Sequence, residues 1–280
     1  MASLHGILVA LITPFTDDKT AIDESRLQAH IEHLIKAGVH GLVPGGSTGE
    51  FTTLTVAERK QLTELCVKFA AGRVPVVAGT GSLSSAEAVE LSVHAAQVGA
   101  ASDNGRAPIH TASGLPIVFY NIPAASGITL SPTEIAGLSK VGVKYLKDTS
   151  GNAPALTELI FGLSDQITSF NGWDTLTFYG LAAGAPGGVW GAANIIPELA
   201  VELYEAVSVK GDLKLGREIW AKAWPICKFL EAHSYAAAVK TGVELIGQPT
   251  GGLRKPFALL NPELTAELKQ LLQKAGVKTV

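Results

Sequence analysis

The segment Val143-Lys-Tyr-Leu-Lys-Asp-Thr-Ser-Gly151 joins a short apolar run to a polar turn, and amphipathic helical patterns flank it at residues 132–140 and 153–163. A short apolar strand between two helices is the repeating unit of a parallel α/β sheet. The polar residues that end such strands collect at one edge of the sheet, where α/β barrels build their sites. This segment therefore predicts the architecture of the chain and the place of its chemistry.

The same order of strand and helix recurs on both sides of this segment. Apolar runs typical of strands cover residues 6–15, 41–44, 74–79, 116–121, 143–147, 167–171 and 188–192, and helical periodicity covers residues 24–37, 56–71, 84–98, 132–140, 153–163 and 175–183. Beyond residue 196 the pattern is helical only, over residues 197–207, 210–232, 234–246 and 262–275. We expect an α/β fold, a (β/α)8 TIM barrel at residues 1–196 with a C-terminal helical extension packed on it at residues 197–280.

One part of the chain is too short for this pattern. A βα unit needs about 30 residues, yet only residues 99–115 separate the third helix from the strand that begins at Pro116. That stretch is polar and lacks an apolar strand core. Because an eight-stranded barrel does not close on seven strands without rearrangement, we expect the fourth-strand region to be shortened or missing in this chain, and we favour missing residues.

The composition of the 280-residue chain excludes several classes of protein. Its net charge of -3 is spread without basic or acidic runs, so we expect no nucleic-acid partner. The apolar stretch near the N-terminus ends at Thr13-Pro14 and is too short to cross a bilayer, so we expect no membrane association. The two cysteines, Cys66 and Cys227, lie in helical patterns typical of buried free thiols, which favours a reducing, cytoplasmic location.

Lys147 and Tyr120 end two neighbouring strands, so a parallel sheet brings them to adjacent positions on its rim. A lysine that is partly desolvated among apolar strands can reach the neutral amine form, which attacks a carbonyl and forms an imine. A tyrosine beside it can transfer protons during imine formation and carbon–carbon bond cleavage. The alternatives are a solvated lysine at a strand end and an aromatic ring that fills the top layer of the barrel.

Two further polar groups follow strand ends. The run Gly45-Gly-Ser-Thr-Gly-Glu50 offers backbone N–H groups and the hydroxyls of Ser47 and Thr48, which suit a carboxylate, although a tight turn is the alternative. Asp174 can bind substrate hydroxyls, although an aspartate at that point commonly caps a helix. The seven histidines have no spacing typical of a metal site, and no G-x-G-x-x-G follows a strand, so we expect neither a metal nor another cofactor.

Three motifs, in this order, resemble the signature segments of the dihydrodipicolinate synthase / N-acetylneuraminate lyase family: Gly46-Ser-Thr-Gly-Glu50, Tyr120-Asn-Ile-Pro123 and Leu146-Lys-Asp-Thr-Ser-Gly151. The likeness extends from residue 6 to residue 257. It implies a (β/α)8 barrel with C-terminal helices, a homotetramer built as a dimer of dimers, and a class I aldolase reaction on pyruvate through a Schiff base. The resemblance also implies roles for single residues: the imine for Lys147, proton relay for Tyr120, binding of the pyruvate carboxylate for Ser47 and Thr48, and lining of the site for Val189 and Gly191.

The chain departs from the family pattern at positions that would contact the second substrate. Where dihydrodipicolinate synthases have an arginine for the carboxylate of the aldehyde, this chain has Ala125, so we expect the pocket to prefer a neutral, hydroxylated or apolar tail to aspartate semialdehyde. If kinetics showed the opposite preference, Arg106 or Arg254 would have to supply the charge. Asp174 matches a sugar-hydroxyl contact of the sialic acid lyase branch, but Thr175 and Gly191 stand where that branch has a glutamate and a serine. The family's loop after the fourth strand, which lends a tyrosine to the relay, falls within residues 99–115.

These features predict a Schiff-base-forming lyase, an aldolase or a dehydratase. Its substrate would be a pyruvate-derived 2-oxo acid, such as a 2-keto-3-deoxy sugar acid or a related 4-hydroxy-2-oxo acid. Two alternatives stand beside this prediction. One is a catalytically silent barrel that binds 2-oxo acids as a sensor or structural subunit, and the other is a 4-hydroxy-tetrahydrodipicolinate synthase.

Overall fold

Eight parallel strands form one sheet in the computed structural model, which describes residues 3–104 and 107–280. The strand order is β2-β1-β8-β7-β6-β5-β4-β3. The strands are β1 (Gly6–Ala10), β2 (Gly41–Val43), β3 (Val77–Gly79), β4 (Ser102–Asn104), β5 (Ile117–Asn121), β6 (Val143–Asp148), β7 (Thr168–Asn171) and β8 (Gly187–Trp190). The prediction of an α/β chain with a parallel sheet is confirmed.

The two ends of this strand order, β2 and β3, meet and close the sheet into a barrel. Leu42 and Val76 form an isolated parallel bridge. The backbone N–H groups of Leu42 and Gly79 donate to the carbonyls of Pro75 and Pro44, at 3.0 and 2.8 Å. Apolar side chains fill the interior, so a reaction has room only at the rim; they are Leu4, Leu8, Ala10, Val43, Val77, Val118, Tyr145, Phe170 and Val189.

Residues Ser102–Asn104 form β4, so the interpretation that the fourth strand is missing is wrong. Val77 of β3 pairs with Ser102, and Ile117 of β5 pairs with Asp103. The fourth strand and its helix fit between the third helix and β5 because both are short. β4 has three residues, as β2 and β3 do, and the following helix α4 (Ala107–Ser113) has seven. Strand pairing uses backbone groups and needs no apolar run, which is why a polar segment can supply the strand.

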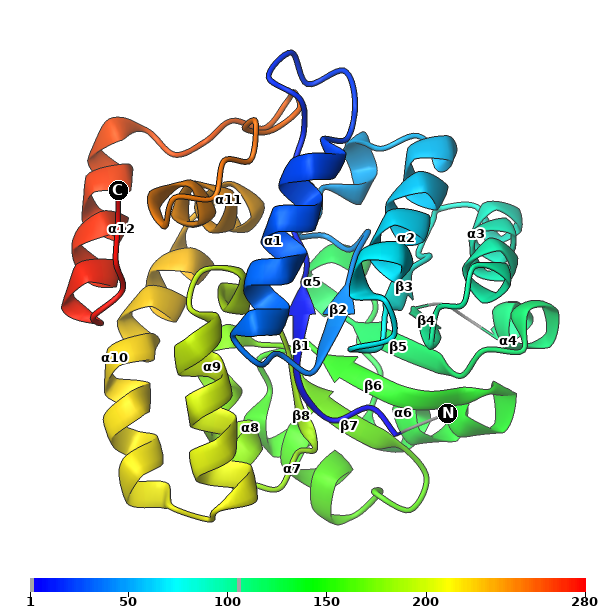
Figure 1. Ribbon diagram of the computed structural model, residues 1–280. Coiled ribbons are helices and arrows are strands. Elements are labelled where there is room, and N and C mark those ends of the chain that lie inside the picture. Colours follow the sequence, from blue (N-terminus) through cyan, green and yellow to red (C-terminus); the bar gives the residue numbers. More distant parts are fainter. Residues whose placement is uncertain (1–2, 105–106) are drawn as a thin grey trace.

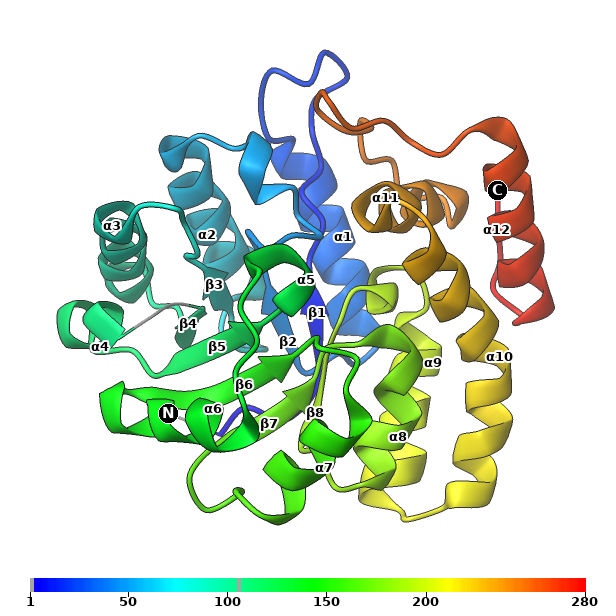
Figure 2. The ribbon, with the colours of Figure 1, turned by 180° about the vertical axis from the view of Figure 1, so that it is seen from behind.

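Helices surround the barrel (Figures 1 and 2). Besides α4, those between the strands are α1 (Glu24–Lys36), α2 (Val56–Ala70), α3 (Ser85–Gln97), α5 (Pro123–Ser126), α6 (Pro132–Gly137), α7 (Ala153–Phe161) and α8 (Thr177–Ala182). Of these, the one-turn helix α5 was not expected from the sequence. Within residues 3–104 and 107–280, no helix combines the length and apolar character that crossing a membrane requires.

Four helices follow β8: α9 (Pro197–Tyr204), α10 (Leu213–Ala232), α11 (Tyr235–Leu245) and α12 (Pro262–Lys274). Figure 1 shows α10 and α12 on the side of the barrel away from α3 and α4. Ile226, Cys227, Leu230, Val239 and Leu268 of these helices join the largest apolar core, which also contains residues of β1 and α1. Because α11 packs against the turn that follows β8, its first residues reach the rim of the barrel.

Candidate active site

Lys147 and Tyr120 lie side by side at the rim. They pair in the register of β5 and β6, and the Lys147 Nζ atom is 4.1 Å from the centroid of the Tyr120 ring. Lys147 also lines a small cavity inside the barrel together with apolar side chains only: Leu4, Leu8, Val43, Val77, Val118, Phe170 and Val189. The structure therefore brings the two residues together, as the strand order predicts, and surrounds the lysine stem with apolar groups.

A β-bulge in β6 produces this pairing. The register between the strands shifts by one residue between Ile117 and Val118, because β6 holds one extra residue there. A shift of one residue turns the side chains of a strand toward the opposite face. Without the extra residue, Tyr120 would pair with Leu146 instead of Lys147.

Hydrogen bonds hold the turn that follows Lys147. The buried carboxylate of Asp148 accepts from the Asn121 amide at 2.7 Å and from the Ser150 hydroxyl at 2.9 Å, and burial raises the pKa of Asp148 above its ordinary value. Gly172, which follows β7, leaves space for the lysine, since a Cβ atom there would lie 2.7 Å from Lys147 Cγ. These contacts fix the direction in which the lysine side chain leaves its strand.

Asp174 follows β7 and is buried. Its carboxylate accepts a 2.7 Å hydrogen bond from the hydroxyl of Tyr235, the first residue of α11. Burial raises the pKa of Asp174 to about 7, and the neighbouring Glu231 raises it while Lys147 lowers it. The charge of Lys147 therefore acts on Asp174, and a tyrosine from the helical extension donates to the same carboxylate.

Glu231 of α10 places a second carboxylate beside Asp174. It accepts hydrogen bonds from the backbone N–H and the hydroxyl of Thr175, at 2.8 and 2.9 Å. Sequence reasoning missed Glu231 and Tyr235, because both lie in the C-terminal helices and carry no local motif. Only the fold brings them to the end of β7.

Val189 and Gly191 lie at the end of β8. Val189 is buried and lines the cavity beneath Lys147. Gly191 lies against Tyr235, since a Cβ atom at Gly191 would be 2.3 Å from the tyrosine hydroxyl. The tyrosine thus occupies the space that a serine at position 191 would need.

Ser47 and Thr48 lie in the turn after β2, at the same rim. Ser47 is exposed and Thr48 is buried. The glycines at the ends of β2 and β3 are in close contact, since a Cβ atom on Gly79 would lie 2.3 Å from the Gly45 carbonyl oxygen. Gly45 also has a φ of +71°, which favours glycine. Glycine at both positions lets the polar turn sit directly on the barrel mouth.

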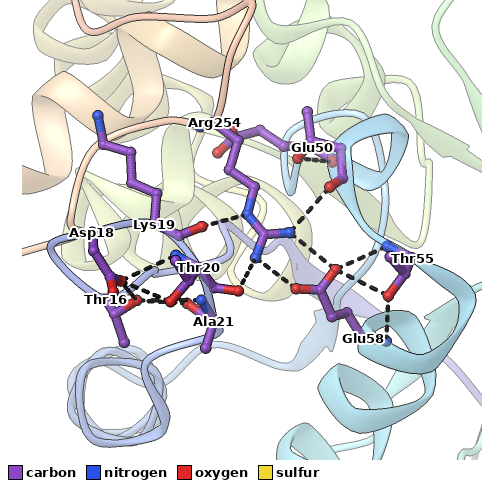
Figure 3. Close-up of polar contacts among 10 residues, drawn as sticks. Thr16, Asp18, Lys19, Thr20, Ala21, Glu50, Thr55, Glu58 and Arg254 are labelled. Atoms are coloured by element: carbon purple, nitrogen blue, oxygen red, sulfur yellow. Dashed lines mark hydrogen bonds and ion pairs between the residues drawn. The ribbon is translucent and has the colours of Figure 1, made fainter.

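The positions expected to recognise a second carboxylate offer little positive charge. Ala125 lies in α5 and is exposed. Arg254 is already engaged, since its guanidinium donates to both oxygens of Glu58 at 2.9 and 2.5 Å and to the carbonyl of Thr20 at 3.0 Å (Figure 3). Arg106 lies outside the described residues. The guanidinium of Arg254 is therefore not free to supply such a charge.

Both cysteines are free and buried, in agreement with the sequence. Over residues 3–104 and 107–280, the structure contains no group of three or more histidine, cysteine, aspartate or glutamate side chains arranged for a metal ion. His30 is buried instead against Asn194, with 3.0 Å between His30 Nε2 and Asn194 Oδ1. This histidine therefore has a structural environment between α1 and the turn that follows β8.

Comparison with known proteins gives a consistent result. The model of the Dihydrodipicolinate synthetase family matches residues 3–103 and 106–275. A 4-hydroxy-tetrahydrodipicolinate synthase of Methanopyrus kandleri is 36% identical over 295 aligned positions, which cover 98% of this chain and 97% of the relative. The crystal structure of dihydrodipicolinate synthase from Aquifex aeolicus has a TM-score of 0.91 at 29% identity and covers 98% and 99% of the two chains. That of YagE, a prophage protein from E. coli K12 in complex with pyruvate, has a TM-score of 0.92 at 28% identity and covers 99% and 100%.

Proposed function

Because the chain belongs to the dihydrodipicolinate synthetase family, whose relatives are lyases of the class I aldolase type, we propose that Lys147 forms a Schiff base with a pyruvate-derived 2-oxo acid. The observation that carries this proposal is the pairing of Lys147 with Tyr120, with 4.1 Å between Nζ and the ring centroid. An amine held against apolar strands, beside a phenol, has the two groups that imine chemistry requires.

In the proposed reaction the amine of Lys147 attacks C2 of the 2-oxo acid, and water leaves as the imine forms. The iminium draws electrons from the bond between C3 and C4, so retro-aldol cleavage releases an aldehyde and leaves an enamine of pyruvate on the lysine. Protonation at C3 and hydrolysis then release pyruvate. Tyr120 transfers the protons, and Ser47 and Thr48 bind the carboxylate.

The second part of the substrate would have a neutral, hydroxylated tail. A terminal carboxylate needs a cation or several donors to offset its desolvation. Ala125 provides none, and the guanidinium of Arg254 is bound to Glu58. Asp174, Glu231 and Tyr235 offer acceptors and a hydroxyl, which suit substrate hydroxyl groups. A 2-keto-3-deoxy sugar acid or a related 4-hydroxy-2-oxo acid meets these conditions.

A second candidate function is that of a 4-hydroxy-tetrahydrodipicolinate synthase, which condenses pyruvate with aspartate semialdehyde. The names of the relatives favour it, since those from Methanopyrus kandleri and Syntrophobacter fumaroxidans both carry this name, at 36% and 32% identity. It shares the Schiff base on Lys147 with the first candidate. The two differ only in the aldehyde, so steady-state kinetics with aspartate semialdehyde and with glyceraldehyde separate them.

Incubation with pyruvate and borohydride, followed by mass spectrometry, tests the Schiff base itself. We expect one covalent adduct per chain, at Lys147. Lys147→Ala should abolish it, whereas Lys144→Ala is the matched control, because Lys144 is an exposed lysine on the same strand. A wild-type chain that takes no adduct would instead favour the catalytically silent barrel that binds 2-oxo acids.

The assembly and the division of the chain are also part of this proposal. The family resemblance supports a homotetramer built as a dimer of dimers, and the two buried free thiols support a location in the cytoplasm. We further propose that residues 1–196 act as the barrel and residues 197–280 as an extension that completes it, since α11 supplies Tyr235. Analytical ultracentrifugation measures the mass of the protein in solution. A dimer or a monomer, with half or a quarter of the tetramer mass, would contradict the proposed homotetramer.

A further inference from the structure

The turn that carries Ser47 and Thr48 has an unusual backbone. We call residues 45–50 the β2 loop. Its last residue, Glu50, has a φ of 57°, in the left-handed region that residues other than glycine rarely adopt. A conformation of this kind persists only where the surrounding structure holds it, so the contacts of Glu50 show what holds the loop.

The Glu50 side chain forms a fully buried ion pair with Lys240 of α11. The distance between Glu50 Oε1 and Lys240 Nζ is 2.6 Å, and both side chains have an exposed fraction of 0%. Lys240 also donates to the carbonyl of Gly252 at 2.6 Å, and its Nζ lies 4.2 Å from the centroid of the Phe15 ring. Burial lowers the pKa of Lys240 to about 8, whereas Glu50 and Glu244 raise it.

The second oxygen of Glu50 has its own partner. Oε2 accepts a 3.2 Å hydrogen bond from the backbone N–H of Arg254, whose side chain is held in turn by Glu58 (Figure 3). One oxygen of the carboxylate therefore pairs with the charge of Lys240, and the other accepts a hydrogen bond from the Arg254 backbone. Glu50 cannot rotate or shift without losing at least one of these contacts.

The same loop is anchored just before Glu50. The hydroxyl of Thr13, which follows β1, donates to the carbonyl of Gly49 at 2.8 Å, and a Cβ atom at Gly49 would lie 2.7 Å from the Leu11 carbonyl oxygen. Gly49 and Glu50, the two residues that follow Thr48, are therefore both held in place by contacts with the rest of the protein.

A buried ion pair contributes little net stability compared with apolar residues of the same volume, because desolvation of the two charges offsets their attraction. Its specific effect is geometric, since a displaced loop would leave both charges buried without a partner. We propose that the buried Lys240–Glu50 pair positions the β2 loop, so that Ser47 and Thr48 meet the carboxylate of the 2-oxo acid. Glu50 and Lys240 are then positioning residues, and this inference rests on the proposed function.

The test measures the pyruvate concentration that gives half-maximal borohydride trapping on Lys147, together with the trapping rate at saturating pyruvate. Glu50→Gln combined with Lys240→Met removes both charges and keeps the volumes. We expect the half-saturating concentration to rise about tenfold or more, with the saturated rate within about threefold of wild type. Glu50→Asp keeps the charge but shortens the side chain by one methylene, and should also raise the half-saturating pyruvate concentration.

The matched control is Lys60→Met combined with Glu90→Gln, which removes an exposed pair with the same 2.6 Å separation on α2 and α3. It should leave both measurements unchanged. Folded Glu50 and Lys240 variants with wild-type half-saturation would overturn the positioning role, even if their melting temperatures fall. Loss of cooperative unfolding in both Glu50 variants would assign the pair to stability instead and also overturn it. A wild-type chain without any adduct would overturn the proposed function and this inference together.

Discussion

The hydroxyl of Tyr235 donates a 2.7 Å hydrogen bond to the carboxylate of Asp174, and so links the first turn of α11 to the end of β7. Both groups lie at the barrel rim, where the positive charge of Lys147 lowers the pKa of the same carboxylate. Asp174 is buried, and its pKa is raised to about 7. Its charge therefore changes near neutral pH, and four of the five predictions below concern this rim.

The raised pKa of Asp174 makes stability depend on pH. The folded state binds the proton of the Asp174 carboxyl more tightly than the unfolded state, so protonation of Asp174 stabilises the fold. This stabilisation is fully present below pH 3.8, the ordinary pKa of the carboxyl, and is lost as the pH rises through about 7. We expect Asp174→Asn to remove this loss. Melting temperatures of both proteins between pH 5 and pH 8.5 check it, and parallel curves would contradict the prediction.

His30 gives the opposite dependence. Burial lowers the pKa of His30 from 6.5 to about 4, so the unfolded state binds the proton more tightly and stability falls as the pH drops from 6.5 toward 4. The loss should reach on the order of 3 kcal/mol. We expect His30→Gln, which cannot be protonated, to show a flatter decline in urea unfolding, and the exposed His5→Gln to behave as wild type.

Tyr120→Phe tests the proton relay and preserves the ring beneath Lys147. We expect the exchange of the C3 protons of pyruvate with deuterated water, followed by NMR, to slow by about 10²–10⁴-fold. Borohydride trapping at long incubation should still occur. Tyr179→Phe on α8 is the control, because Tyr179 is partly exposed and lies on the outside of the barrel. Exchange within about twofold of wild type would assign Tyr120 to packing.

Ala125→Arg tests the identity of the aldehyde. A guanidinium at this position can pair with a terminal carboxylate, so kcat/KM for aspartate semialdehyde should rise by about tenfold or more while that for glyceraldehyde does not. Ala124→Arg adds the same charge one residue away and should have a smaller effect. If the wild type already prefers the semialdehyde to every neutral aldehyde offered, the assignment of a hydroxylated tail is wrong.

Gly191→Ala tests the contact between β8 and α11. A methyl group at this position would lie 2.3 Å from the Tyr235 hydroxyl, so the tyrosine must move away from Asp174. We expect a loss of about 1–3 kcal/mol in free energy of unfolding, typical of an added methyl in a packed site. Because the hydrogen bond from Tyr235 lowers the pKa of Asp174, its loss should also raise that pKa. The loss of stability due to Asp174 should then occur at higher pH. In Tyr235→Phe the same shift is expected without the steric conflict.

The sequence predicts the order of strands and helices because apolar periodicity repeats along the chain, and this order places Lys147 and Tyr120 at the ends of neighbouring strands. The exact pairing depends on the bulge in β6, where one extra residue changes the register. Apolar periodicity does not reveal a bulge, since the residues on both sides of it are apolar. The same limit explains β4, whose polar residues pair through the backbone.

The residues that the sequence did not reveal come from distant segments. Tyr235 lies 61 positions beyond Asp174 in the sequence, and Glu231 lies almost as far. Neither has a neighbour in sequence that marks it as part of a site. A pattern that repeats every few residues carries no information about such contacts, which depend on how the last helices pack on the barrel.

The hydrogen bond between Arg254 and Glu50 joins residues 204 positions apart, and this separation has a consequence for synthesis. A ribosome adds about 5–20 residues each second, so Glu50 is added to the chain about 10–40 seconds before Arg254. During that interval the nascent barrel has its first strands but no partner for Glu50. The proposed cradle for a small carboxylate would therefore be completed last, after almost the whole chain has been made.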